Sequence, residues 1–140
     1  MPTTSDQELY NELAYYTLAH GDKEFIHQYV VDAYMAQHAD EKTKPIAITF
    51  ALVGLYLHVE KNHTGREVQL AHTKMAKERK DWPRFELPEE RGTTMVADVL
   101  RVKPGPERDQ AIRDWVKSTW AAWQSARPQI IALAKRELGV

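Results

Sequence analysis

The stretch from Pro45 to Leu57, PIAITFALVGLYL, contains only apolar residues apart from one glycine and one threonine. As an α-helix, its thirteen residues would extend about 20 Å at about 1.5 Å per residue, whereas a membrane crossing needs about 20 residues. The stretch is therefore too short to span a membrane, and its apolar circumference has to be buried against other segments. We expect it to form the buried central helix of the fold, over about residues 45–60, with His58 and Glu60 at its polar end.

Length and composition restrict the class of protein. The chain has 140 residues, which fits a single helical domain over residues 1–140. It contains no cysteine, which excludes thiol chemistry, iron–sulfur clusters and cysteine-bound zinc. Lys and Arg number 19 against 20 Asp and Glu, so no overall field attracts a polyanion, and we expect no nucleic-acid partner. The first residues, MPTTSDQELYNEL, lack the features of a secretory signal. The expectation is a cytoplasmic protein without a membrane partner.

The spacing of apolar residues and the positions of Gly and Pro predict five to six helices. Residues 81–92 contain two prolines and should form a loop, pinned across the bundle by Trp82, Phe85 and Leu87. Short connections favour antiparallel neighbours, so the predicted fold class is all-α, an irregular antiparallel helical bundle. The predicted helices cover about 5–20, 23–38, 45–60, 65–80, 93–102 and 107–138, where 93–102 could instead be a strand and Pro128 should kink or divide the last helix.

The histidines are unevenly placed in this bundle. An antiparallel arrangement puts His27, His58 and His72 near one end, each on a different helix, with His20 and His63 in connections at that end. Neutral imidazoles from three rigid helices can hold a divalent ion such as zinc at about 2.0–2.1 Å and leave one position for water. The sequence therefore makes His27, His58 and His72 the candidate residues of a polar or metal-binding pocket, with zinc, nickel, iron or manganese as the candidate ion.

Polar residues near these histidines are expected to line the same pocket: Asp32, Glu60, Arg66 and Gln69. A carboxylate there could add an oxygen ligand or act as a general base for a metal-bound water. No HExxH motif and no repeated Glu-x-x-His pair supports this chemistry, and there is no glycine-rich phosphate loop. A histidine at the edge of an apolar face is more often simply hydrogen bonded. We therefore assign no catalytic residue, and a small molecule is the partner that such a pocket would take.

A second interpretation is a non-enzymatic helical interaction module. Here exposed aromatic side chains such as Trp82 and Phe85 would mediate docking to a partner or self-association. The two-part last helix, with Trp115, Trp120 and Trp123, is the candidate interface for a homodimer.

Three segments carry a resemblance to a known family: FIHQYVVDAYMAQHA (25–39), FALVGLYLHVEKNHTGREVQLAH (50–72) and WVKSTWAAW (115–123). On these segments the chain resembles an uncharacterised bacterial protein family of unknown function. The resemblance implies a small soluble bacterial protein and carries no activity, cofactor or partner with it. Its densest matches surround six residues, namely His27, Asp32, His58, Arg66, Gln69 and His72.

Overall fold

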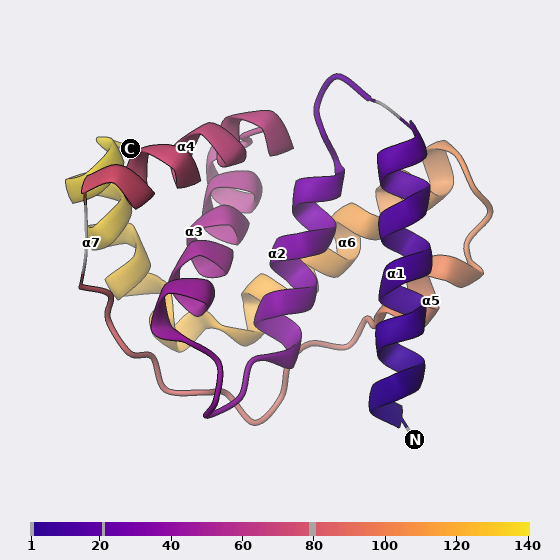
Figure 1. Cartoon of the computed structure of the whole chain (residues 1–140), viewed down its shortest axis with the longest axis horizontal. Helices are drawn as coiled ribbons and strands as arrows, with labels where there is room; N and C mark the ends of the chain where they lie inside the picture. The colour runs from indigo at the N-terminus through magenta and orange to yellow at the C-terminus, as the bar shows by residue number, and fades with distance from the viewer. Residues whose placement is uncertain (1, 21, 79–80) are drawn as a thin grey trace.

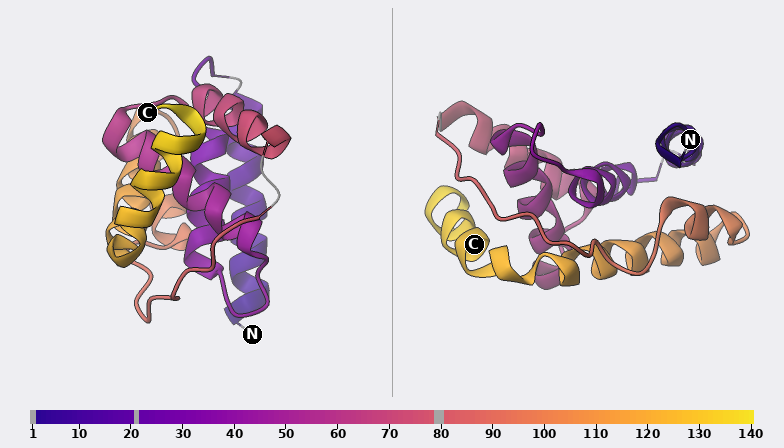
Figure 2. Two further views of the ribbon diagram at one scale, coloured as in Figure 1. Left: turned by 90° about the vertical axis from the view of Figure 1, so that its left-hand side faces the viewer. Right: turned by 90° about the horizontal axis from the view of Figure 1, so that it is seen from below.

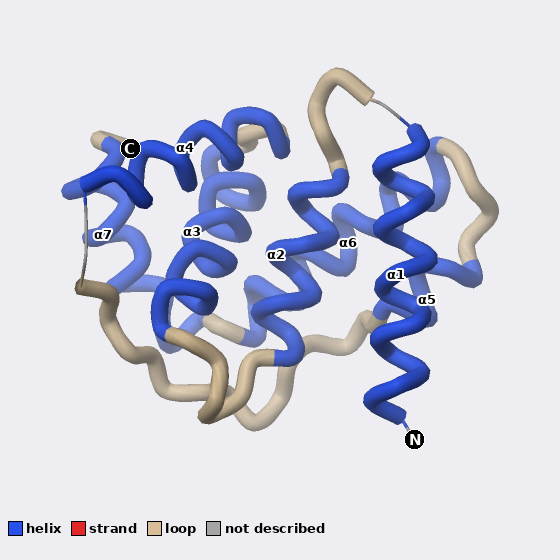
Figure 3. The backbone as a smooth tube through the Cα atoms, in the orientation of Figure 1, coloured by secondary structure: helices blue, strands red, loops and turns tan. Residues whose placement is uncertain are grey.

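A computed structural model describes residues 2–20, 22–78 and 81–140 of the chain (Figure 1). These ranges contain seven α-helices, one short 3₁₀ turn and no strand (Figure 3). The predicted all-α class is therefore confirmed, with seven helices where five to six were expected. The elements are α1 (Pro2–His20), α2 (His27–His38), α3 (Pro45–Lys61), α4 (Gly65–Glu78), α5 (Val96–Arg101), α6 (Pro106–Ala122), η1 (Gln124–Ala126) and α7 (Arg127–Leu138).

Helix α3 is the centre of the fold, as the apolar stretch predicts. It contacts α2, α4, α6 and α7, and Figure 2 shows it between the α2 side of the molecule and the layer formed by α6 and α7. Every residue from Ala51 to Leu57 is buried, because a helix with neighbours on several sides needs apolar residues on its whole circumference. No helix in the described ranges is long and apolar enough to cross a membrane.

Proline positions explain the additional helix. Pro128 lies in the first turn of α7, where its missing N–H costs no hydrogen bond, and η1 separates α7 from α6. The predicted last helix is therefore two helices. Residues 96–101 form α5 rather than a strand, and the Asp98 carboxylate accepts a hydrogen bond from the Met95 N–H at 2.8 Å at its start.

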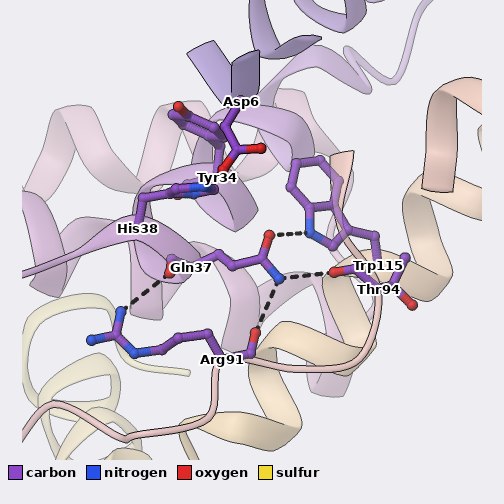
Figure 4. Close-up of polar contacts among 7 residues, drawn as sticks. All are labelled: Asp6, Tyr34, Gln37, His38, Arg91, Thr94 and Trp115. Atoms are coloured by element: carbon purple, nitrogen blue, oxygen red, sulfur yellow. Dashed lines mark hydrogen bonds and ion pairs between the residues drawn. The ribbon is translucent and has the colours of Figure 1, made fainter. Parts of the chain in front are cut away.

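The loop 81–95 crosses the bundle, and Gln37 is one of the residues that hold it (Figure 4). The Gln37 amide donates to the carbonyl oxygens of Arg91 at 3.1 Å and Thr94 at 2.8 Å, and its Oε1 accepts from Trp115 Nε1 at 2.9 Å. The Arg91 guanidinium in turn donates to the Gln37 carbonyl at 3.2 Å. The predicted apolar anchors are confirmed, since Phe85 belongs to the core and Trp82 and Leu87 pack against it.

Candidate functional site

The three histidines of the predicted metal site have separate partners. A hydrogen bond of 2.9 Å joins His27 Nδ1 to Thr17 Oγ1 on α1. His72 Nε2 donates to the Phe50 carbonyl on α3 at 2.7 Å, and Phe50 lies eight residues, or roughly 12 Å along the helix, before His58. Burial lowers the pKa of all three imidazoles, so they are neutral near pH 7.

These positions do not bring His27, His58 and His72 together. Among the residues that the structure describes, no group of three or more His, Asp or Glu side chains could hold a metal ion. The side chain of His20, which was expected at the same end, lies outside the described part of the structure. The three-histidine metal site therefore gains no support from this geometry.

The predicted pocket residues Asp32 and Glu60 serve other contacts. Asp32 is 3% exposed, and its Oδ1 accepts a hydrogen bond from Gln28 Nε2 at 3.1 Å. Glu60 accepts from Trp120 Nε1 at 2.7 Å and from two nitrogens of Arg127, at 2.8 and 2.6 Å. Glu60 thus ties the end of α3 to α6 and α7, away from the histidines.

Arg66 and Gln69, the other two predicted pocket residues, bond to each other on α4. Arg66 donates to Gln69 Oε1 at 2.6 Å, and its guanidinium lies 4.7 Å from the centre of the Phe25 ring. This pair lies on the surface and lines no cavity with His58.

A polar cavity of about 370 Å³ does adjoin His58. It lies where the start of α2, the end of α3 and one face of α6 meet, which is the end of the bundle where the histidines were expected. Only His58 among the predicted site residues lines it. The lining consists of Glu24, Tyr29, His58, Val59, Asn62, His63, Thr64, Gln110, Arg113 and Lys117.

The turn after α3 fixes the orientation of His58. Asn62 adopts a left-handed conformation with φ of 57° and ends the helix, a conformation that asparagine tolerates better than most residues. The His63 carbonyl then accepts two hydrogen bonds, from His58 Nδ1 and from the Tyr29 hydroxyl, each 3.1 Å long. The rings of Tyr29 and His58 stack with centres 3.6 Å apart. Both side chains are therefore held by one backbone oxygen and by each other.

These contacts also determine where the imidazole proton is. A carbonyl oxygen only accepts hydrogen bonds, so His58 Nδ1 carries the hydrogen in the neutral ring and Nε2 carries a lone pair. Among the described residues, none forms a hydrogen bond with His58 Nε2. His58, which lines the cavity, therefore has an acceptor nitrogen that no described residue bonds.

Two cations on α6 give the cavity its charge. Arg113 and Lys117 are four residues apart and so share a face of the helix. Arg113 lies 3.7 Å from the Glu24 carboxylate, the one acidic group of the lining. Burial lowers the pKa of His58, and Arg113 and Lys117 lower it further by disfavouring a third positive charge.

Sequence reasoning missed Glu24, Gln110, Arg113 and Lys117. The last three recur on one face of α6, but a polar face is normal for any helix at a surface, so the spacing alone carried no functional signal. Only the packing of α6 against the turn after α3 makes that face part of a site.

Comparisons with known proteins identify a family and nothing more. A family model that is described as a family of unknown function matches residues 4–124, which confirms the resemblance seen in the sequence. Searches among curated proteins and among solved structures found no match. Since a fold alone does not determine an activity, the function has to be argued from the cavity.

Proposed function

The chain belongs to DUF5946, a family of unknown function, and from the geometry of the His58 cavity we propose that it is a small-molecule-binding protein whose ligand is anionic. The observation that carries this proposal is the pairing of Arg113 and Lys117 in a cavity with one opposing carboxylate. With His58 neutral, Arg113 and Lys117 outweigh Glu24 and the lining has a net positive charge. A carboxylate or phosphate would neutralise that charge.

Arg113 has hydrogen-bonding capacity for such a ligand. Its 3.7 Å contact with Glu24 is longer than the 2.7–2.9 Å that is usual for a charge-assisted hydrogen bond. Its planar guanidinium can donate to two oxygens of one carboxylate or phosphate. Lys117 would add a second charge one turn further along α6. The volume of about 370 Å³ is near the lower end of the range for small-molecule sites.

The proposal can be tested by titrating ¹⁵N-labelled protein with sodium propionate and with inorganic phosphate at constant ionic strength. Binding should shift the amide signals of residues 58–64 and 110–117. Arg113→Gln should weaken it by about tenfold or more, because hydrogen bonds to charged groups are worth about 1.5–3 kcal/mol. Arg101→Gln is the matched control, since Arg101 is an exposed residue of α5 that pairs with Asp98. Equal binding by wild type and Arg113→Gln, or none by either, would contradict the proposal.

Most of the aromatic side chains that were expected to form the surface of an interaction module are buried, and Trp82 is half-buried. Phe85 is 9% exposed, Trp82 packs edge-on against Phe50 at 5.1 Å, and the three tryptophans of the last helices are buried: Trp115, Trp120 and Trp123. A homodimer would have to use other side chains, such as Tyr15 and Leu18 of α1, which are 75% and 56% exposed.

A further inference from the structure

Resting on the anion-binding function above, we propose that the ligand of this cavity carries a hydroxyl group next to its anionic group, and that His58 Nε2 accepts the hydrogen bond of that hydroxyl. The shared chemistry is a small hydroxy acid, with either a carboxylate or a phosphate as the acid. The inference concerns which ligands the site prefers, beyond the attraction of an anion to Arg113 and Lys117.

The first argument is that His58 offers an acceptor that the protein leaves for a ligand. The Nδ1 hydrogen is donated to the His63 carbonyl at 3.1 Å, and stacking on Tyr29 limits rotation of the ring. Nε2 at the opposite edge of the ring therefore keeps its lone pair. An acceptor enclosed in a ligand complex costs free energy unless a donor reaches it. A simple anion has no such donor, whereas a hydroxyl group has one.

The second argument is that no other hydrogen in the hydrogen-bonded group around His58 is available to it. Burial raises the pKa of Tyr29 to about 12, so the phenol keeps its hydrogen and donates it to the His63 carbonyl at 3.1 Å. Tyr29 and His58 thus both donate to the His63 carbonyl, and neither of these hydrogens is directed at His58 Nε2. Since no described side chain bonds to Nε2, water or the ligand can supply its donor.

The third argument favours a hydroxyl over an ammonium group as that donor. The charged groups facing the cavity are Glu24, Arg113 and Lys117, which leave it with a net positive charge when His58 is neutral. An ammonium group next to His58 would be repelled by the same two cations that disfavour the imidazolium. A neutral hydroxyl can donate to Nε2 without that repulsion.

Two matched pairs of probes test this inference: lactate with propionate, and glycerol 3-phosphate with propyl phosphate. Within each pair the probes differ chiefly in hydroxyl groups, and comparing the pairs distinguishes a carboxylate ligand from a phosphate ligand. In at least one pair the hydroxylated probe should bind about threefold to tenfold more tightly, the effect of one net hydrogen bond. In His58→Phe, which keeps a ring to stack on Tyr29, this preference should disappear.

A measurement on the wild type guards against a folding defect in the variant. In the imidazole ¹⁵N spectrum, the Nε2 signal of His58 should have the shift of an unprotonated nitrogen. It should then move toward a hydrogen-bonded value with the hydroxylated probe of the preferred pair and not with its partner. If both members of each pair bind equally and Arg113→Gln weakens both, the hydroxyl inference is overturned and the anion site stands. If no probe binds, the anion site itself is overturned.

Discussion

The carboxyl group of Asp32 fills the space beside Gly54 that a side chain would need. A β-carbon on Gly54 would lie 2.0 Å from Asp32 Oδ2, and 3.2 Å from Val68 Cγ1. Helices α2 and α3 approach each other closely at this point because one of them carries no side chain there. Gly54 therefore persists in the middle of a helix, where glycine ordinarily costs about 1 kcal/mol relative to alanine.

Gly54→Ala should destabilise the protein by about 1–3 kcal/mol, although alanine is the better helix former, because the added methyl group overlaps the Asp32 carboxyl. The free energy of unfolding from urea titration measures this. The control is the same change in an Asp32→Ala background, where the overlap is removed and Gly54→Ala should be much less harmful. Equal costs in the two backgrounds would show that the overlap is not the cause.

Asp32 should also make the stability depend on pH. Burial raises the pKa of Asp32 well above its ordinary value, and the hydrogen bond from Gln28 opposes the shift only in part. The folded state holds the Asp32 proton more tightly than the unfolded state. The stability that this protonation contributes is therefore complete below pH of about 4 and is lost as the pH rises. Oδ2 has no hydrogen-bond partner in the described structure, so nothing there compensates a negative charge.

Asp32→Asn resembles the neutral acid in shape and cannot ionise. Its unfolding free energy should therefore decline less than that of the wild type between pH 5 and pH 8, measured by urea titration at each pH. Tyr10→Phe is the control. Burial and, to a smaller extent, Asp32 raise the pKa of Tyr10, so Tyr10 does not titrate between pH 5 and pH 8 and the variant should keep the wild-type slope. Parallel curves for Asp32→Asn and wild type would contradict a neutral buried carboxyl.

The fold could be predicted from the sequence further than the site could. An apolar circumference fixes a helix at the centre whatever surrounds it, so α3 was predicted almost to its ends. The position of His72 was not predictable in this way. The spacing along the chain indicates how far along the bundle His72 lies. It does not indicate in which direction the side chain points, because each residue turns a helix by about 100°. The rotation of α4 that brings His72 to the Phe50 carbonyl depends on how the helices pack.

The buried polar residues show the same limit. Gln37 is buried on α2, and its partners Trp115 and Thr94 are far along the chain. His58 was found because it ends the apolar stretch. Arg113 and Lys117 became site residues only through the packing of α6 on the turn after α3, which no local pattern encodes.

Gln37→Leu should lower the free energy of unfolding by about 2–3 kcal/mol. The side chain of Gln37 is 5% exposed, and its loss leaves the Trp115 N–H and two loop carbonyls without partners. Urea unfolding followed by tryptophan fluorescence would measure it. The matched control is Gln7→Leu, because Gln7 is exposed and, within the described part of the chain, its side chain bonds only to Asn11 one turn away. A cost like that of the control would mean that Gln37 does not hold the loop.

Glu60→Gln should cost about 1 kcal/mol, and the cost should shrink at high salt. The change removes the negative charge that pairs with Arg127 through two short hydrogen bonds. Because water screens this partly exposed ion pair, the cost is small, and added salt weakens the attraction further. Glu89→Gln, at an exposed loop position, is the control for a change of net charge. Urea titrations at low and high salt would compare them, and a salt-independent cost would argue against an ionic contribution.

His72 should make the protein sensitive to acid. Burial lowers the pKa of His72, although its hydrogen bond to the Phe50 carbonyl acts in the opposite direction. The unfolded state therefore takes up this proton first, so the stability that the neutral ring contributes is complete above pH of about 6.5 and is lost as the pH falls below it.

His72→Gln keeps an N–H donor for the Phe50 carbonyl and cannot titrate. It should lose less stability than the wild type between pH 7 and pH 5, and comparison at pH 8, where both side chains are neutral in both states, isolates the packing cost of the substitution. An equal loss would place the acid sensitivity in His27 and His58, whose pKa values burial also lowers.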